Sequence, residues 1–131
     1  MIKEAYCSYE VSKLLKERGF NEKIYSFYKE KKNKPLYIES YSSEWNNKYL
    51  HLGHISAPTH QMACAWLREV HKVLIVIDAY HADHWDGYID SFEIRIYSHA
   101  STIIVPNEIV HHTDYTEAVE TAIKYSLENL L

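Results

Sequence analysis

Glycine, proline and cysteine are scarce in this chain of 131 residues, which contains three, three and two of them. So little glycine and proline argues against linkers and collagen-like repeats, and neither GxGxxG nor GxxxxGK[ST] occurs, which disfavours the common nucleotide-binding folds. Cys7 and Cys64 form no CxxC pair, so neither a disulfide framework nor a thiolate zinc site is indicated. The longest apolar runs, 62–67 and 73–77, are far shorter than the ~20 residues that span a bilayer. We therefore expect a cytoplasmic protein with no membrane partner.

Charge is divided unevenly along the chain. Residues 1–66 hold 10 Lys/Arg and 7 Asp/Glu, or +3, whereas residues 67–131 hold 4 and 11, or −7. Non-specific nucleic-acid binding depends on neutralising phosphates, and the only dense basic stretch is Lys29, Lys31, Lys32 and Lys34. Nucleic acid is therefore an unlikely partner, and single-strand nucleic-acid binding is our third hypothesis for function.

The first half of the chain predicts a helix followed by a hairpin. In SYEVSKLLKERGF, apolar residues recur at helical spacing, Ser8 can cap the start, and Gly19 suits the left-handed end. Two β-prone runs, 23–28 and 35–41, flank the polar segment KEKKNK and predict a hairpin. We expect Leu36 and Ile38 to face inward, and Tyr37 and Tyr41 outward. Residues 42–57 predict an ordered loop with a short strand at 49–52.

The second half predicts a helix, a longer hairpin and a last helix. An apolar stripe at the 3.6 period runs through 58–71, and the β-branched run VLIVIDAY follows it. Residues 88–98 alternate strictly, which places Phe92, Ile94 and Ile96 inward and Glu93, Arg95 and Tyr97 outward. Residues 102–105 predict an edge strand. Asp114 with Glu117 predicts the cap of the last helix.

The resulting order is α-β-β-α-β-β-α. It predicts an α+β fold, a mainly antiparallel sheet with helices packed on one face. A length of 131 residues and a mass of 15.5 kDa fit a single α+β domain over residues 1–131.

Three segments together carry a resemblance: SYEVSKLLKERGF, APTHQMACAWLREVHKV and YTEAVETAIKYSLENLL. The combination resembles a group of short, uncharacterised proteins of Bacteroides-type bacteria, often associated with prophages or mobile elements. The resemblance is scattered over most of the chain and is strongest in the second and third of these segments. It implies a bacterial cytoplasmic or phage-associated setting, and it implies no activity, ligand or catalytic residue.

The segment HADHWDG supplies ligand types that a metal ion accepts. His81 and His84 stand three residues apart with Asp83 between them, and a turn could direct all three at Zn, Ni or Mn. A third or fourth ligand would come from elsewhere, and a solvated turn explains the same residues without a metal. A metal-binding protein or metal-dependent hydrolase is therefore our alternative hypothesis. No GxSxG elbow or activated thiolate context supports an enzyme.

Tyrosine is abundant, with 12 residues. If the predicted strands adjoin, an aromatic patch lies on the outward sheet face, and this mixture of aromatic and charged side chains is typical of protein interfaces. The alternative is that cross-strand tyrosines only stabilise the sheet. Our first hypothesis is a non-catalytic protein-interaction or accessory module that binds a protein partner or self-associates. Its expected surface consists of Tyr37, Tyr41, Tyr80, Tyr97 and Trp85.

Overall fold

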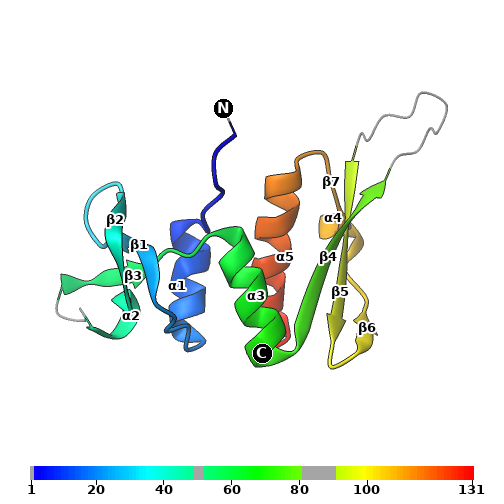
Figure 1. The fold of residues 1–131 in the computed structure, drawn as a ribbon. Helices are drawn as coiled ribbons and strands as arrows, with labels where there is room; N and C mark the ends of the chain where they lie inside the picture. The colour runs from blue at the N-terminus through cyan, green and yellow to red at the C-terminus, as the bar shows by residue number, and fades with distance from the viewer. Residues whose placement is uncertain (1, 49–51, 81–90) are drawn as a thin grey trace. The chain divides into compact units, whose positions relative to one another are not determined.

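The computed structural model describes residues 2–48, 52–80 and 91–131 of the chain, which divides into two compact units (Figure 1). The first unit is Met1–Ala63 and the second is Cys64–Leu131. Each contains helices and one antiparallel sheet, so the predicted α+β class is confirmed. The strands form two sheets instead of the one expected. The single domain over residues 1–131 stays a prediction.

The first helix, α1 (Tyr9–Glu17), begins and ends as its sequence predicts. The Ser8 side chain accepts a hydrogen bond from the backbone N–H of Val11, which satisfies a donor of the first turn. Gly19 adopts φ = 92°, and the N–H of Phe20 donates to the carbonyl of Leu15. Val11 and Leu15 are buried, as the helical spacing requires.

The sheet of the first unit has the order β2-β1-β3. It is formed by β1 (Ile24–Lys29), β2 (Leu36–Ser43) and β3 (His54–Ser56), all antiparallel. Neighbouring strand residues point to opposite faces. Tyr28 lies against Tyr9 of α1, whereas Phe27 lies against Trp45 of the short helix α2 (Trp45–Lys48). The expectation that helices cover one face is therefore wrong for this sheet, because α1 and α2 contact opposite faces.

The segment 42–57 is more structured than its sequence indicates. It contains α2 and the strand β3, which starts at His54, whereas residues 49–51 of the strand expected at 49–52 lie outside the described residues. Trp45 Nε1 donates to the carbonyl of Ile24 at 2.6 Å. Asn46 Nδ2 donates to the carbonyl of Phe20 at 2.7 Å, and Asn46 Oδ1 accepts from the N–H of Ser56 at 2.8 Å. These long-range bonds fix the segment against the core of the first unit.

The second unit contains a regular hairpin. The helix α3 (His60–His71) begins in the first unit and ends in the second, where it leads through Lys72 into β4 (Val73–Tyr80). β4 pairs with β5 (Ser91–Ser98) along its whole length without a register shift. The predicted helix and hairpin are thus confirmed. β6 (Ser101–Ile103) extends the sheet, as expected from the edge-strand pattern.

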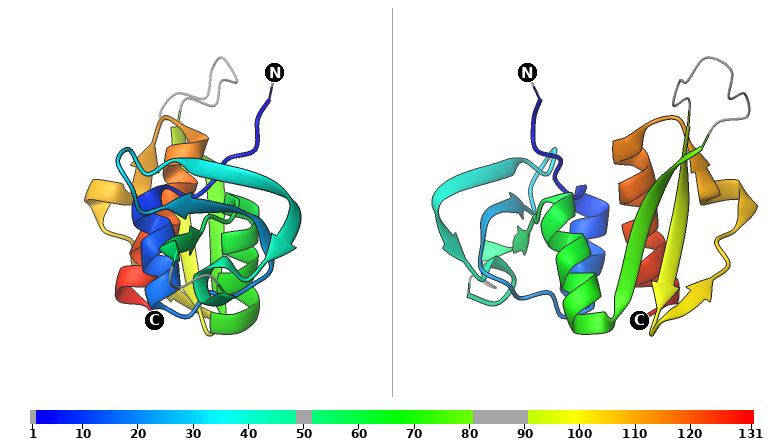
Figure 2. Two further views of the ribbon diagram at one scale, coloured as in Figure 1. Left: turned by 90° about the vertical axis from the view of Figure 1, so that its left-hand side faces the viewer. Right: turned by 45° about the vertical axis from the view of Figure 1, so that its right-hand side comes forward.

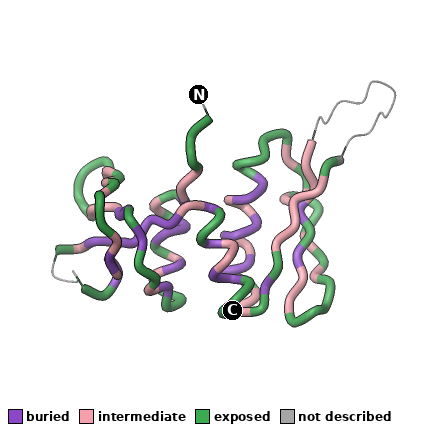
Figure 3. The backbone as a smooth tube through the Cα atoms, in the orientation of Figure 1, coloured by how far each residue is buried: buried purple, intermediate pink, exposed green. Residues whose placement is uncertain are grey.

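Two short elements separate β6 from the last helix. They are α4 (Asn107–Val110) and β7 (His111–His112), and β7 returns to pair with β5. The helix α5 (Tyr115–Asn129) then begins at Asp114, whose side chain accepts from the N–H of Glu117 at 2.9 Å, as predicted. α5 packs on one face of β4 and β5, called here the inner face (Figure 2). The buried residues of β5 and α5 include Ile94, Ile96, Ala122, Ile123 and Leu127, and Figure 3 colours the buried stretches of the backbone purple.

Candidate interaction surface

The face of the second sheet opposite α5 carries the clearest candidate surface. Strand alternation places Ile94 and Ile96 in the core, at 2% and 0% exposure, so Arg95 and Tyr97 point to the other side. Cross-strand pairing adds Leu74 beside Tyr97, and Asp78 beside Glu93. We call this side the outer face, formed by Leu74, Val76, Asp78, Glu93, Arg95, Tyr97 and Thr102. The predicted orientation of Tyr97 is confirmed.

A row of ion pairs orders the charged side chains of the outer face. Arg95 Nη2 lies 3.2 Å from Asp78 Oδ2 and 3.6 Å from Glu93 Oε2. His111 Nε2 lies 4.0 Å from Glu93 Oε1. Half-exposed pairs of this kind contribute little to folding stability, about 0 to 1 kcal/mol each. They place the Arg95 guanidinium near two carboxylates of the same face.

A groove of about 400 Å³ lies beside β5, next to the segment that connects β6 to β7. Ile96 pairs with Ile103, and Glu93 pairs with His111, so residues 94–95 of β5 face the longer segment 104–110, which contains α4. Residues 104–110 do not pair with β5, and the groove lies between the region where β6 pairs with β5 and the region where β7 pairs with β5. Both apolar and polar side chains line the groove: Glu93, Ile94, Arg95, Ile96, Tyr97, Thr102, Ile103, Val105, Asn107, Val110 and His111.

The tyrosines of the first sheet do not join this surface. Tyr37 pairs with Phe27 across β1 and β2 and stacks on its ring, so the prediction that Tyr37 faces outward is wrong. Ile38, expected inward, is 61% exposed, and Leu36 is also exposed. Tyr41 is 53% exposed and lies beside Trp45. The strands β2 and β5 belong to different sheets, so the expected continuous patch does not form.

The remaining predicted site residues lie at or beyond the end of β4. Tyr80 is the last residue of this strand and pairs with Ser91. Trp85 and the predicted metal ligands His81, Asp83 and His84 lie outside the described residues. Metal binding by this segment stays a prediction.

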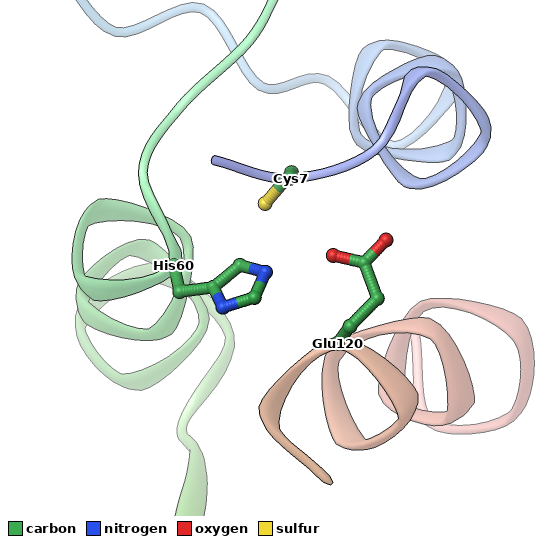
Figure 4. Close-up of side chains that lie close together, drawn as sticks. All are labelled: Cys7, His60 and Glu120. Carbon is green, nitrogen blue, oxygen red and sulfur yellow. The ribbon is translucent and has the colours of Figure 1, made fainter. Parts of the chain in front are cut away.

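Cys7 and His60 come together within the first unit, an arrangement that the sequence analysis missed. The N–H of Cys7 donates to the carbonyl of Pro58, and the N–H of His60 donates to the carbonyl of Ala5. Cys7 Sγ and a ring nitrogen of His60 therefore lie within 4.8 Å of each other (Figure 4). Glu120, also labelled in Figure 4, belongs to α5 of the second unit. No local spacing signals the pair, because the two residues are brought together by a bridge between Tyr6 and Thr59.

The second cysteine has the chemistry of a packing residue. Burial raises the pKa of the Cys64 thiol to about 11, and the positive charge of Arg68 opposes this shift. The thiolate is therefore scarce near neutral pH, and a thiol in this state is a poor nucleophile. This agrees with the lack of an activated thiolate context in the sequence.

No protein family, no curated protein and no solved structure matches this chain. Within residues 2–48, 52–80 and 91–131, no helix combines the length and the apolar character that crossing a bilayer requires.

Proposed function

We propose that this protein is a non-catalytic module that binds another protein through the outer face of the β4–β5–β6 sheet. The observation that supports this most is the placement of Tyr97 and Arg95 in the lining of a groove of about 400 Å³, on the face opposite the helix α5. Tyrosine and arginine are among the residues that contribute most to binding at protein interfaces. The groove next to them offers both apolar and polar groups to a side chain of the partner.

The ion pairs of Arg95 bias its guanidinium toward one position on the outer face. A free arginine side chain loses rotamer freedom when a partner immobilises it, which weakens binding. Arg95 is already placed by Asp78 and Glu93 on its own sheet. A partner that supplies a hydrogen-bond acceptor or an aromatic ring over the guanidinium therefore meets a side chain that is already oriented.

Charge favours a protein partner over nucleic acid. Residues 67–131, which include the whole outer face, hold 4 Lys/Arg and 11 Asp/Glu. A polyanion would be repelled by this part of the chain, because nucleic-acid affinity depends on neutralising phosphates with basic side chains. We expect the partner to present an extended segment with apolar and basic residues.

Selection from a displayed library of random peptides tests the proposal, because such a library samples many partner sequences at once. Wild-type protein is expected to enrich a related set of peptides with apolar and basic residues. Tyr97→Ala and Arg95→Ala are each expected to weaken binding of a selected peptide by about tenfold, or about 1.4 kcal/mol.

Tyr25→Ala is the matched control, because Tyr25 is 57% exposed on β1 of the other sheet. Peptide binding by this variant is expected to equal that of wild type. The proposal fails if no peptide family is enriched, or if the selected peptides bind Tyr97→Ala and Arg95→Ala as tightly as wild type.

A further inference from the structure

β4 forms an open edge of the second sheet. The sheet order is β4-β5-β6, and among the described residues no strand pairs with β4 on the side away from β5. The pairing with β5 is regular from Val73–Ser98 to Tyr80–Ser91, so the strand contains no bulge. An edge of this kind presents a row of backbone N–H and C=O groups that another strand can pair with.

The features that protect edge strands are missing from most of β4. Monomeric proteins place lysine, proline, inward charges or bulges on exposed edges. The first five residues of β4, 73–77, are Val, Leu, Ile, Val and Ile. Leu74 is 41% exposed on the outer face. A regular apolar edge is therefore accessible to a second strand.

The core is also incomplete along this edge. Ile75 pairs with Ile96 and Ile77 with Ile94, so all four point to the inner face. The two β5 residues are buried, whereas Ile75 and Ile77 are only half-buried (Figure 3). A strand added beside β4 would cover the exposed part of these isoleucines.

We infer that the occupant of this edge is a second copy of the chain, whose β4 pairs antiparallel with the first about a two-fold axis at Ile75. This register places Leu74 opposite Val76 and Val73 opposite Ile77 of the other copy, and every pair from 73 to 77 is apolar. Because opposed residues share a face, both copies keep their inner faces on the same side. The contact is isologous and closes as a dimer.

The charged residues at the two ends of the apolar run favour the register centred on Ile75 and a second copy of the chain as the occupant. Lys72 precedes the apolar run and Asp78 follows it, so each lysine comes next to the opposite charge of the other copy. A register centred on Val76 would instead place Asp78 opposite Leu74. Each copy has a basic residue before the apolar run and an acidic residue after it. When two copies pair antiparallel, the basic end of one run lies beside the acidic end of the other.

Sedimentation velocity of the purified full chain, over a micromolar concentration series, tests the dimer. Wild type is expected to form dimers, and Leu74→Lys and Val76→Glu are each expected to be monomers, because each places a charge directly opposite an apolar residue of the other copy. The double variant Leu74→Lys/Val76→Glu is expected to dimerise again, since every new lysine then lies opposite a new glutamate.

Thr102→Lys is the matched control, because it adds the same charge to the outer face on β6, away from the open edge. It is expected to remain dimeric, as is Tyr97→Ala, so failure of the dimer is distinguishable from failure of the proposed binding face. A monomeric wild type, or single variants that dimerise like wild type, would overturn the inference. A double variant as monomeric as the single ones would overturn the register centred on Ile75. Far-UV circular dichroism establishes that each variant is folded.

Discussion

Phe27 and Tyr37 face each other across β1 and β2, with ring centroids 5.5 Å apart and ring planes inclined by 12°. The ammonium group of Lys29 lies 4.5 Å from the centroid of the Tyr37 ring, and that of Lys31 lies 5.6 Å from it. Stacking and cation–π contacts of this kind stabilise a fold. Tyr37 is therefore part of the aromatic cluster of the first unit, together with Trp45 and His54.

Replacing Tyr37 by alanine is expected to lower the free energy of unfolding, because the stack on Phe27 and the cation–π contacts with Lys29 and Lys31 are lost. Tyr37→Phe keeps the ring and is expected to cost less than about 0.5 kcal/mol. Urea unfolding measures both. Tyr25→Ala is the control for an exposed tyrosine, and equal losses in Tyr37→Ala and Tyr25→Ala would contradict the assignment of Tyr37 to the core.

Asn46 is expected to be among the most sensitive polar residues. Asn46→Ala would leave the carbonyl of Phe20 and the N–H of Ser56 without their side-chain partner inside the first unit. An unsatisfied buried polar group costs about 1 to 3 kcal/mol. The neighbouring Asn47 is exposed, so Asn47→Ala is expected to change stability by less than about 0.5 kcal/mol. Similar urea midpoints for the two variants would contradict the role of Asn46.

The sequence was sufficient to predict the elements that depend on residues only a few positions apart in the chain. The capping side chains Ser8 and Asp114 and the alternation in residues 91–98 each act within a few residues, and tertiary contacts do not override them. The inward placement of Ile94 and Ile96, and with it the outward placement of Tyr97, followed from that alternation. This part of the candidate surface was therefore predictable.

The sequence could not predict features that depend on distant residues. In β2 either set of alternating residues is apolar enough to face the core, and the contact of Tyr37 with Phe27 decides between them. The short helix α2 depends on bonds from Trp45 and Asn46 to residues more than 20 positions earlier. The groove depends on β6 and β7 pairing with the same strand at either side of residues 94–95. Local patterns carry none of this information.

A glycine in the turn between β5 and β6 is expected to stabilise the protein. His99 and Ala100 join Ser98 to Ser101 and adopt φ = 51° and 67°, values that a two-residue hairpin turn requires but that side chains with a Cβ disfavour. Ala100→Gly is expected to raise the free energy of unfolding by about 0.5 to 1 kcal/mol. Ala65→Gly on α3 is the control and is expected to lower it by about 1 kcal/mol. A loss of stability in Ala100→Gly would contradict the strain.

Tyr9 is expected to make stability depend on alkaline pH. Burial, and then the hydrogen bond that Tyr9 donates to Glu30 at 2.6 Å, raise the pKa of the Tyr9 phenol from 10.0 to about 12. The folded state thus favours the neutral phenol. Its contribution is fully present below pH 10 and is lost as the pH rises from 10 to about 12.

Urea unfolding of wild type and Tyr9→Phe at several pH values measures this contribution. The advantage of wild type is expected to be constant below pH 10 and to shrink between pH 10 and about 12. Glu30→Gln, which removes the negative acceptor, is expected to move the loss to lower pH. A difference between wild type and Tyr9→Phe that does not change with pH would contradict the raised pKa.

The most direct test of the central claim compares the affinity of a selected peptide for Tyr97→Ala with its affinity for Tyr37→Ala. Tyr97 lines the groove of the outer face, whereas Tyr37 stacks on the buried Phe27 of the other unit. We expect Tyr97→Ala to bind about tenfold more weakly with little change in the free energy of unfolding. We expect Tyr37→Ala to lose stability and, where it is folded, to bind like wild type. Unchanged affinity in Tyr97→Ala would contradict the claim that the outer face binds the partner.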